Sequence, residues 1–259
     1  MAFPRIIPVL LLRNKGLVKT IKFKNPVYVG DPFNALKIFN EKEVDELIFL
    51  DIDASKEGRE PPYDYLKEVA SECFMPLGYG GAVKSIQQIK RLIQSGIEKI
   101  CINTQAFENP DFIKSATDTF GTSTIVGAMD VKRNMWGKYH VYTKGGTINT
   151  NREPLSYAQK LQALGVGELF VNNIERDGTL LGYDVELIKQ ISSGVDIPVI
   201  ACGGAGKFED LITVIKDGNA SAAAAGSIFV FHGKHKAVLI TYPEYKKIKD
   251  ALTTSNYRA

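Results

Sequence analysis

The sequence contains few residues that could form disulfides or hold a metal ion. Its three cysteines, Cys73, Cys101 and Cys202, lie far apart, and none belongs to a CxxC motif or a Cys/His cluster. Disulfide frameworks and structural zinc sites both need cysteines at closer, regular spacing. We therefore expect reduced thiols in a cytoplasmic protein, with no metal site and no bound cofactor.

Long apolar runs and a strong net charge are also missing. No apolar run reaches the roughly 18 residues that a membrane-spanning helix needs, so we expect no membrane insertion. The net charge is +3 among 259 residues, which is too small and too evenly spread to favour a nucleic-acid partner. The first 14 residues have no basic leader and no small-residue cleavage site, and they are predicted to hold a buried strand rather than a signal peptide.

The chain does contain a regular alternation of short apolar runs and amphipathic segments. Continuous apolarity is typical of strands that are buried on both faces of a parallel sheet. Asp31-Pro32 and Asn109-Pro110 predict helix starts between the runs, and Gly96 and Gly165 predict helix ends. The predicted strands are Arg5–Leu11, Glu46–Ile52, Met75–Tyr79, Glu98–Asn103, Thr124–Asp130, Glu168–Ile174, Ile197–Cys202 and Ala220–Gly226.

This order of elements favours one α/β domain, a (β/α)8 TIM barrel that spans residues 1–259. An open doubly wound sheet is the alternative, but the G-x-G-x-x-G fingerprint is absent after the first strand. One insertion, Lys132–Asn151, alternates polar and apolar residues and is predicted to form a hairpin after the fifth strand.

The two halves of the chain resemble each other. Gly80-Gly81 recurs as Gly203-Gly204, at an interval of about half the chain length. Such a period indicates two fused half-barrels, here about 1–122 and 123–259, each with four βα units.

A repeated barrel half predicts a repeated ligand site. The same interval carries Asn103-Thr104 onto Gly226-Ser227. The glycine pairs and these residues would cradle two phosphates at opposite sides of the barrel mouth, because glycine-rich turns leave backbone N–H groups free. We count Asp177 and Gly178 among the predicted phosphate-binding residues. The alternative is that the glycines only permit tight turns.

Several motifs carry a family resemblance. They are Arg5-Ile-Ile-Pro8, Leu50-Asp-Ile-Asp-Ala-Ser55, Ile102-Asn-Thr104, Asp130-Val-Lys-Arg133, Arg176-Asp-Gly-Thr179 with Gly182-Tyr-Asp184, and Gly203-Gly-Ala-Gly-Lys207. In order and spacing, over about residues 4–232, they resemble the cyclase subunit of imidazole glycerol phosphate synthase. The resemblance implies a barrel that takes ammonia from a glutaminase at its N-terminal face. Ammonia then crosses the interior and cleaves a bisphosphorylated ribulosyl-formimino-carboxamide ribonucleotide at the C-terminal face.

The family's chemistry uses two aspartates, at the ends of the first and fifth strands. Asp130 matches the second of them, but Leu11 stands where the first is expected. A leucine cannot transfer a proton, and loss of a positioned acid or base costs about 10²- to 10⁴-fold in rate. Asp51 and Asp53 are nearby carboxylates on another strand. Lys19 lies in the segment after the first strand, which is predicted to be a loop, and it matches a mobile lysine that contacts substrate in the family.

The resemblance also implies an ammonia gate at the N-terminal end of the barrel. Arg5, Glu46, Lys99 and Glu168 match the four gate positions, and two positive and two negative groups can close into an ion-paired ring. Without the resemblance, such residues are usually solvated charges at strand starts. Glu98 matches an acidic position that contacts the glutaminase.

Two further segments, Leu17–Phe23 and Tyr28–Pro32, resemble a paralogous group that is associated with sugar amidation in bacterial surface-polysaccharide clusters. In that group an apolar residue replaces the first aspartate. The barrel is thought to pass ammonia from a glutaminase to an ATP-using N-acetyl sugar amidotransferase, which makes an acetamidino sugar. We take this as the leading function. The alternatives are a working cyclase, with Asp130 and a substitute carboxylate, and a scaffold protein without ammonia traffic.

Overall fold

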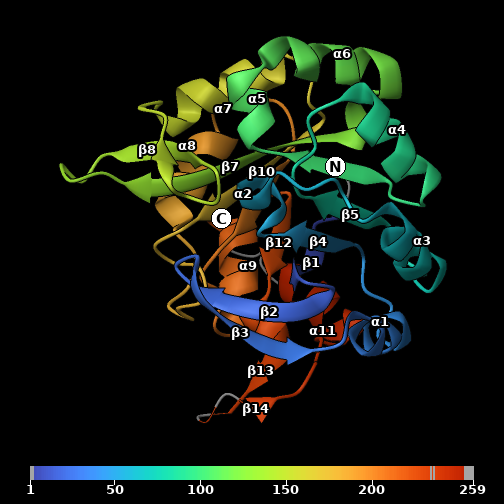
Figure 1. Cartoon of the computed structure of the whole chain (residues 1–259). Helices are drawn as coiled ribbons and strands as arrows, with labels where there is room; N and C mark the ends of the chain where they lie inside the picture. The colour runs from blue at the N-terminus through green and yellow to red at the C-terminus, as the bar shows by residue number, and fades with distance from the viewer. Residues whose placement is uncertain (1–2, 234, 236, 254–259) are drawn as a thin grey trace.

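The computed structural model describes residues 3–233, 235 and 237–253, with strands in the centre and helices around them (Figure 1). Within these residues, eight parallel strands pair in a closed ring, in which β7 pairs with β10 and β12 pairs with β1. The predicted (β/α)8 barrel is therefore confirmed. The barrel strands are β1 (Arg5–Arg13), β4 (Leu47–Asp51), β5 (Leu77–Gly80), β6 (Lys99–Ile102), β7 (Ile125–Arg133), β10 (Glu168–Asn173), β11 (Val199–Cys202) and β12 (Ala222–Ala225).

Helices cover the outside of the ring, and their starts follow the predicted signals. The Asp31 side chain accepts hydrogen bonds from the N–H groups of Phe33 and Asn34 at 2.9 and 3.4 Å, which caps the first helix. The longer helices are α1 (Pro32–Glu41), α3 (Tyr63–Ser71), α4 (Ile86–Gln94), α6 (Pro110–Phe120), α7 (Pro154–Ala163), α8 (Val185–Ser192), α9 (Phe208–Lys216) and α11 (Tyr245–Thr253). The short ones are α2 (Ala54–Glu57), α5 (Thr104–Glu108), the 3-10 turn η1 (Thr122–Thr124) and α10 (Ser227–Val230).

Antiparallel hairpins are added to the barrel. The predicted hairpin after the fifth barrel strand is present, because β7 continues into β8 (Tyr139–Thr143) and β9 (Ile148–Asn149). The segment after β1 was predicted as a loop, and this was wrong. It forms β2 (Gly16–Ile21) and β3 (Lys24–Gly30), and β2 pairs with β1.

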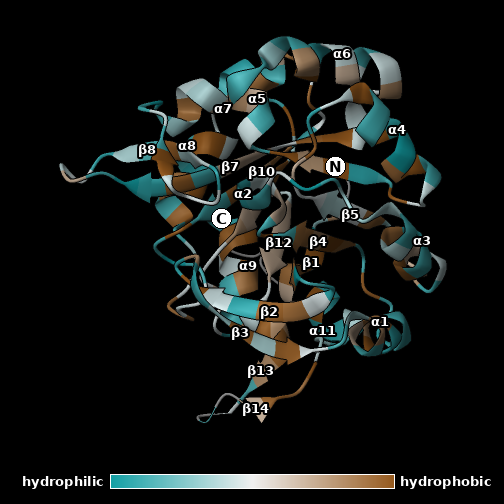
Figure 2. Ribbon diagram, in the orientation of Figure 1, coloured by the Kyte–Doolittle hydropathy of each residue, from teal (hydrophilic) through white to brown (hydrophobic). Residues whose placement is uncertain are grey.

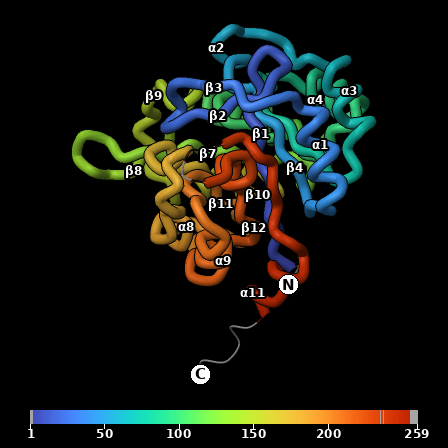
Figure 3. Tube along the Cα trace, turned by 90° about the horizontal axis from the view of Figure 1, so that it is seen from below, coloured from blue at the N-terminus to red at the C-terminus, as the bar shows by residue number. Residues whose placement is uncertain are grey.

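A third hairpin, β13 (Phe231–His232) with β14 (Ala237–Val238), precedes the last helix. That helix returns to the start of the chain, as the trace in Figure 3 shows, where the Phe3 and Tyr245 rings lie 6.4 Å apart.

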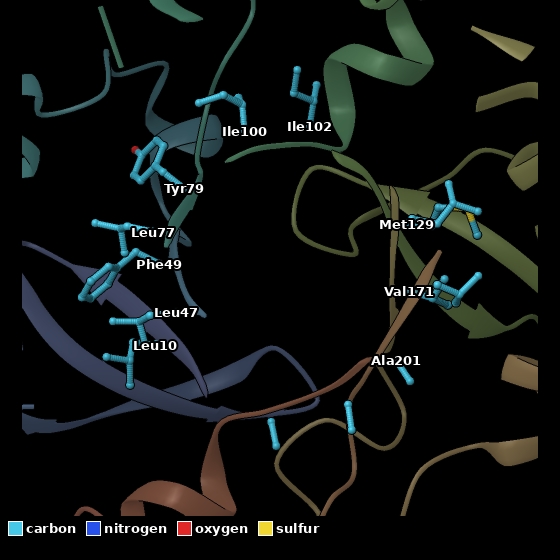
Figure 4. Close-up of a cluster of buried hydrophobic side chains, with 14 of the residues drawn as sticks. Leu10, Leu47, Phe49, Leu77, Tyr79, Ile100, Ile102, Met129, Val171 and Ala201 are labelled. Atoms are coloured by element: carbon cyan, nitrogen blue, oxygen red, sulfur yellow. The ribbon is translucent and has the colours of Figure 1, made fainter. Parts of the chain in front are cut away.

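The apolar core has two layers, separated by the strands themselves. Outward-facing strand residues such as Leu47 and Phe49 pack against the helices, and Figure 4 shows these side chains radiating from the ring. In Figure 2 brown residues lie on the central strands β4 and β7, and teal residues lie on the surrounding helices. Inward-facing residues form a second, smaller layer, because side chains alternate along each strand. Its buried members are Ile7, Val9, Ile48, Cys101, Val126, Ala128, Phe170, Ile200, Cys202, Ala222 and Ala224.

Small residues line two sides of the barrel interior. On β5, Leu77 and Tyr79 face the helices, so Gly78 and Gly80 face inward. On β12 the inward residues are alanines. Next to β5, the side chains of Ile48 and Leu50 fill the space in front of these glycines.

Candidate functional site

A cavity of about 340 Å³ opens at the C-terminal ends of the barrel strands. This is the face that carries the active site in (β/α)8-barrel enzymes. The cavity brings together many of the predicted site residues, from both halves of the chain. They are Leu11, Lys19, Gly80, Gly81, Asn103, Thr104, Asp130, Asp177, Gly226 and Ser227.

Asp130 is one of the acidic residues that line this cavity. Asn103 Nδ2 donates a hydrogen bond to Asp130 Oδ2 at 2.8 Å. Burial, with a smaller contribution from the negative charge of Asp177, raises the pKa of Asp130 to about 7. The carboxyl group can therefore take up or release a proton near neutral pH.

The wall next to β1 has no acid. Leu11 lies there with Val9 and Leu50, so this side of the cavity is apolar. Asp51 also lines the cavity, but it accepts hydrogen bonds from both Arg59 Nη1 and Nη2 at 3.2 Å. The guanidinium thus occupies both carboxylate oxygens of Asp51.

Asp53 is not a substitute either. Its carboxylate accepts a hydrogen bond from Arg13 Nε at 2.7 Å, and it is not among the cavity residues.

Lys19 is buried in this structure. It lies on β2, and its Nζ donates a hydrogen bond to the carbonyl oxygen of Val9 at 2.7 Å. Burial lowers the pKa of Lys19 to about 8, and the charge of Asp177 opposes that shift. A Cβ atom on Gly226 would lie 2.1 Å from Nζ, so the glycine makes room for the amine.

The second pair of glycines forms a turn that other residues could not adopt without strain. Gly203 and Gly204 have φ of 92° and 115°, and a Cβ on Gly204 would lie 2.2 Å from the carbonyl oxygen of Gly182. A small cavity of about 20 Å³ lies beside this turn, and Asp177, Gly178, Gly226 and Ser227 also line it. The two halves of the predicted phosphate set thus line two adjoining cavities, and their binding of phosphate remains a prediction.

The four predicted gate residues form a closed ring at the opposite end of the barrel. Arg5 pairs with Glu46, and with Glu168 at 2.6 Å. Lys99 Nζ lies 2.9 Å from Glu46 and 2.8 Å from Glu168. Each charge therefore contacts two of opposite sign. Glu98 is exposed at the same end.

Asn172 is one of the cavity residues that the sequence reasoning missed. Asn172 is 5% exposed, lines the cavity, and is the partner of Asp130 in the pairing of β10 with β7. Its only signal in the sequence was its position at the end of a predicted strand.

The structure shows no candidate metal centre or membrane helix in its described part. Among residues 3–233, 235 and 237–253, no three His, Cys, Asp or Glu side chains are placed to hold one metal ion. In the same residues, no helix is long and apolar enough to cross a bilayer.

Fold and site together define a (β/α)8-barrel protein with an acidic group in a cavity at its C-terminal mouth and a ring of charges at the other end. The chain belongs to the histidine biosynthesis protein family, whose sequence model matches residues 5–236.

Curated relatives cover nearly the whole chain. It is 52% identical to the Pseudomonas aeruginosa protein "Putative imidazole glycerol phosphate synthase subunit hisF2". The alignment covers 244 residues, which are 94% of this chain and 97% of the relative. It is 45% identical over 249 residues, 96% of each chain, to the Vibrio vulnificus protein "Putative imidazole glycerol phosphate synthase subunit hisF3". It is 40% identical over 228 residues to "Imidazole glycerol phosphate synthase subunit HisF" of Alkaliphilus metalliredigens, 88% of this chain and 90% of the relative. The chain is thus a HisF-like protein.

Proposed function

We propose that this chain is the barrel subunit of a glutamine-dependent amidation system, which accepts ammonia at the ring and delivers it at the cavity. The observation that carries the proposal is the alignment of three parts along one barrel. A closed charged ring lies at one end, an apolar interior follows, and a cavity with only one of the two family acids lies at the other end.

The ring supplies the entrance. Buried or half-buried charges persist when each has a partner, and here every charge has two. The closed ring excludes bulk water, and displacement of the Lys99 ammonium opens it.

A glutaminase subunit docks over this end, where Glu98 supplies an acidic contact. Phe74, in the loop before β5, is 83% exposed on the same face and adds an apolar contact. Large exposed apolar side chains are common at such interfaces.

The interior selects the neutral molecule. Transfer of an isolated ion into an apolar medium costs far more than transfer of a neutral polar molecule. Ammonium therefore stays outside, and ammonia crosses the apolar interior.

At the mouth, ammonia leaves the barrel for an acceptor. Leu11 removes one acid of the cyclase pair, so this chain acts as a conduit to a second enzyme. That partner is an ATP-dependent N-acetyl sugar amidotransferase, and the product is an acetamidino sugar of a bacterial surface polysaccharide. A phosphate-bearing ligand fits the glycine turns of the two cavities.

A working cyclase in histidine biosynthesis is the second candidate, and one observation favours it. The pKa of Asp130 is raised to about 7, which suits a general acid or base at neutral pH. Against it, the nearby carboxylates of Asp51 and Asp53 are bound to arginines.

A cyclase assay separates the two candidates. The purified protein receives the ribulosyl-formimino substrate with excess ammonium at alkaline pH, which makes a glutaminase unnecessary. We expect turnover about 10²-fold or more below that of a true cyclase. Turnover within about tenfold of a true cyclase would establish the second candidate instead. Leu11→Asp, which restores the missing acid, is the informative variant if turnover is low.

A further inference from the structure

Two of the hairpin segments that are added to the barrel differ in charge from the rest of the chain. Residues 16–30, which contain β2 and β3, include three lysines and no Asp or Glu. Residues 131–152, which contain the end of β7 with β8 and β9, include three lysines, two arginines and no Asp or Glu. The whole chain carries a net charge of +3, so the residues outside these two segments are net acidic. We call the two segments the mouth hairpins.

The mouth hairpins form one surface at the cavity end of the barrel. Each starts where a barrel strand ends, because β2 pairs with residues 11–13 of β1 and β8 pairs with residues 130–133 of β7. Both contribute residues to the wall of the large cavity. The turns of the two hairpins also meet, since a Cβ atom on Gly146 would lie 3.1 Å from the ring of Phe23.

Large apolar side chains are exposed on both mouth hairpins. Val27 and Tyr28 are 60% and 66% exposed on β3, which pairs only with β2 among the described strands. Met135 and Trp136 are 96% and 83% exposed in the turn between β7 and β8, which projects beyond the helices in Figures 1 and 3. Within the described residues, the eight longer helices together carry two exposed large apolar side chains. Such grouping of exposed apolar side chains is typical of a protein interface.

Several cations of the mouth hairpins have no acidic partner in the chain. Lys144 does have one, since its Nζ lies 3.1 Å from Glu108. Lys22, Lys24 and Lys138 are exposed and form no ion pair within the part of the chain that the structure describes. None of these three lines a cavity, so a ligand inside the barrel mouth does not account for them. Their charge is available to a partner of opposite sign.

We propose that the mouth hairpins are the docking surface for the enzyme that accepts ammonia, and that this enzyme presents an acidic face with apolar side chains. The inference rests on the proposed function and adds to it the place where the two proteins meet. A partner bound to both hairpins covers the cavity, because both hairpins line it. This cover is necessary, because ammonia that escapes into water at neutral pH takes up a proton and is no longer a nucleophile.

The side chains divide into an anchor and a charged rim. Trp136 enters a pocket of the acceptor enzyme, as exposed aromatic anchors do at protein interfaces. Lys22, Lys24 and Lys138 lie around it and pair with carboxylates of the enzyme. Charged groups at a rim set the rate and salt dependence of association more than the final affinity.

Binding of the purified N-acetyl sugar amidotransferase to the barrel, measured by calorimetry, tests the surface. Trp136→Ala should raise the dissociation constant by about 30-fold, as is typical of an aromatic anchor. Lys22→Glu combined with Lys24→Glu should raise it by about tenfold at low salt, and by less at high salt, because salt screens exposed charges. If neither variant changes the dissociation constant by more than about twofold, the proposal is overturned.

Each variant has a matched control elsewhere on the barrel. Phe74→Ala removes an aromatic side chain that is also 83% exposed, but at the opposite end of the barrel. Lys67→Glu combined with Lys90→Glu makes the same change of charge on the exposed surfaces of α3 and α4. Both controls should bind the amidotransferase nearly as well as the parent protein does. Equal losses in the controls and in the mouth variants would contradict docking at the mouth hairpins.

Two other occupants of the surface are tested with the same variants. Vesicles of phosphatidylglycerol and phosphatidylcholine serve as the probe for an anionic membrane, and sedimentation of the barrel alone reports a second copy of the chain. We expect no vesicle binding and a monomer. Vesicle binding that is lost in the Lys22 and Lys24 variant, or a dimer that is lost in Trp136→Ala, would assign the surface to another occupant and overturn the proposal.

Transfer of glutamine nitrogen then separates this inference from the proposed function. If the amidotransferase binds at the mouth hairpins but no glutamine nitrogen reaches the sugar, the proposed function fails and the docking surface stands. If nitrogen reaches the sugar equally well with the parent protein, Trp136→Ala and the Lys22 and Lys24 variant, the docking surface fails and the proposed function stands.

Discussion

Glu46→Gln tests whether the ring is a buried ion-pair network. The side chain of Glu46 is 2% exposed, and one of its oxygens accepts from both Arg5 and Lys99. Loss of one partner from a buried pair costs about 3–5 kcal/mol. Here the side chains of Arg5 and Lys99 are 24% and 18% exposed, and both keep Glu168 as a partner. We therefore expect Glu46→Gln to lower the free energy of unfolding by about 2–3 kcal/mol.

Urea unfolding measures this cost as a lower midpoint with an unchanged slope. Asp118→Asn is the matched control, because it breaks the pair of Asp118 with Lys114, whose side chains are 61% and 57% exposed. Loss of such an exposed helical pair should cost no more than about 0.5 kcal/mol. If Glu46→Gln costs no more than Asp118→Asn, the reasoning about the ring is refuted.

Three further predictions concern the cavity end of the barrel. Burial and the charge of Asp177 raise the pKa of Asp130 from 3.8 to about 7, so the folded protein binds a proton that the unfolded chain releases. Stability should therefore fall as pH rises from about 4 to about 7. The thermal unfolding midpoint should fall less steeply with pH in Asp130→Asn than in the parent protein. Equal pH dependence of the two midpoints would contradict the raised pKa of Asp130. Crystals grown with sulfate should show an anion beside Gly81 and another beside Gly203, and density at neither turn would count against the phosphate sites. Gly204→Ala should lower the free energy of unfolding by about 1–3 kcal/mol, because its Cβ would meet the Gly182 carbonyl oxygen and its φ is positive; an unchanged unfolding midpoint would show that the turn adapts.

The barrel could be predicted because its signal is repeated along the chain. Each barrel strand is buried on both faces and is therefore a continuous apolar run, which the sequence displays directly. The hairpin of β2 and β3 carries no such signal. Val27 and Tyr28 are 60% and 66% exposed, and Lys19 is a charged residue in a buried position. Its pairing depends on β1 continuing beyond the barrel to Arg13, which local periodicity does not reveal.

The site residues that match family motifs could be predicted from the sequence. Residues whose role depends on which way their side chain points could not. Charges at strand starts are usually solvated, so the ring was expected only from the family resemblance at Arg5, Glu46, Lys99 and Glu168. The closure of the barrel brings these four side chains into contact. Asn172 is followed by Asn173, and the two differ only in the face of β10 from which their side chains project. Asn173 instead donates to Asp184 at 2.9 Å and holds the turn before α8.

Transfer of glutamine nitrogen through the ring is the most direct test of the account. The barrel is reconstituted with a glutaminase and the sugar amidotransferase, and nitrogen-15 from glutamine is followed into the sugar. We expect Lys99→Ala and Arg5→Ala to lower the fraction of released nitrogen that reaches the sugar, while Lys114→Ala on α6 leaves it unchanged. Added ammonium should largely restore amidation in both ring variants. If both ring variants transfer glutamine nitrogen as well as the parent protein does, the ring is a set of surface charges and the conduit does not run through it.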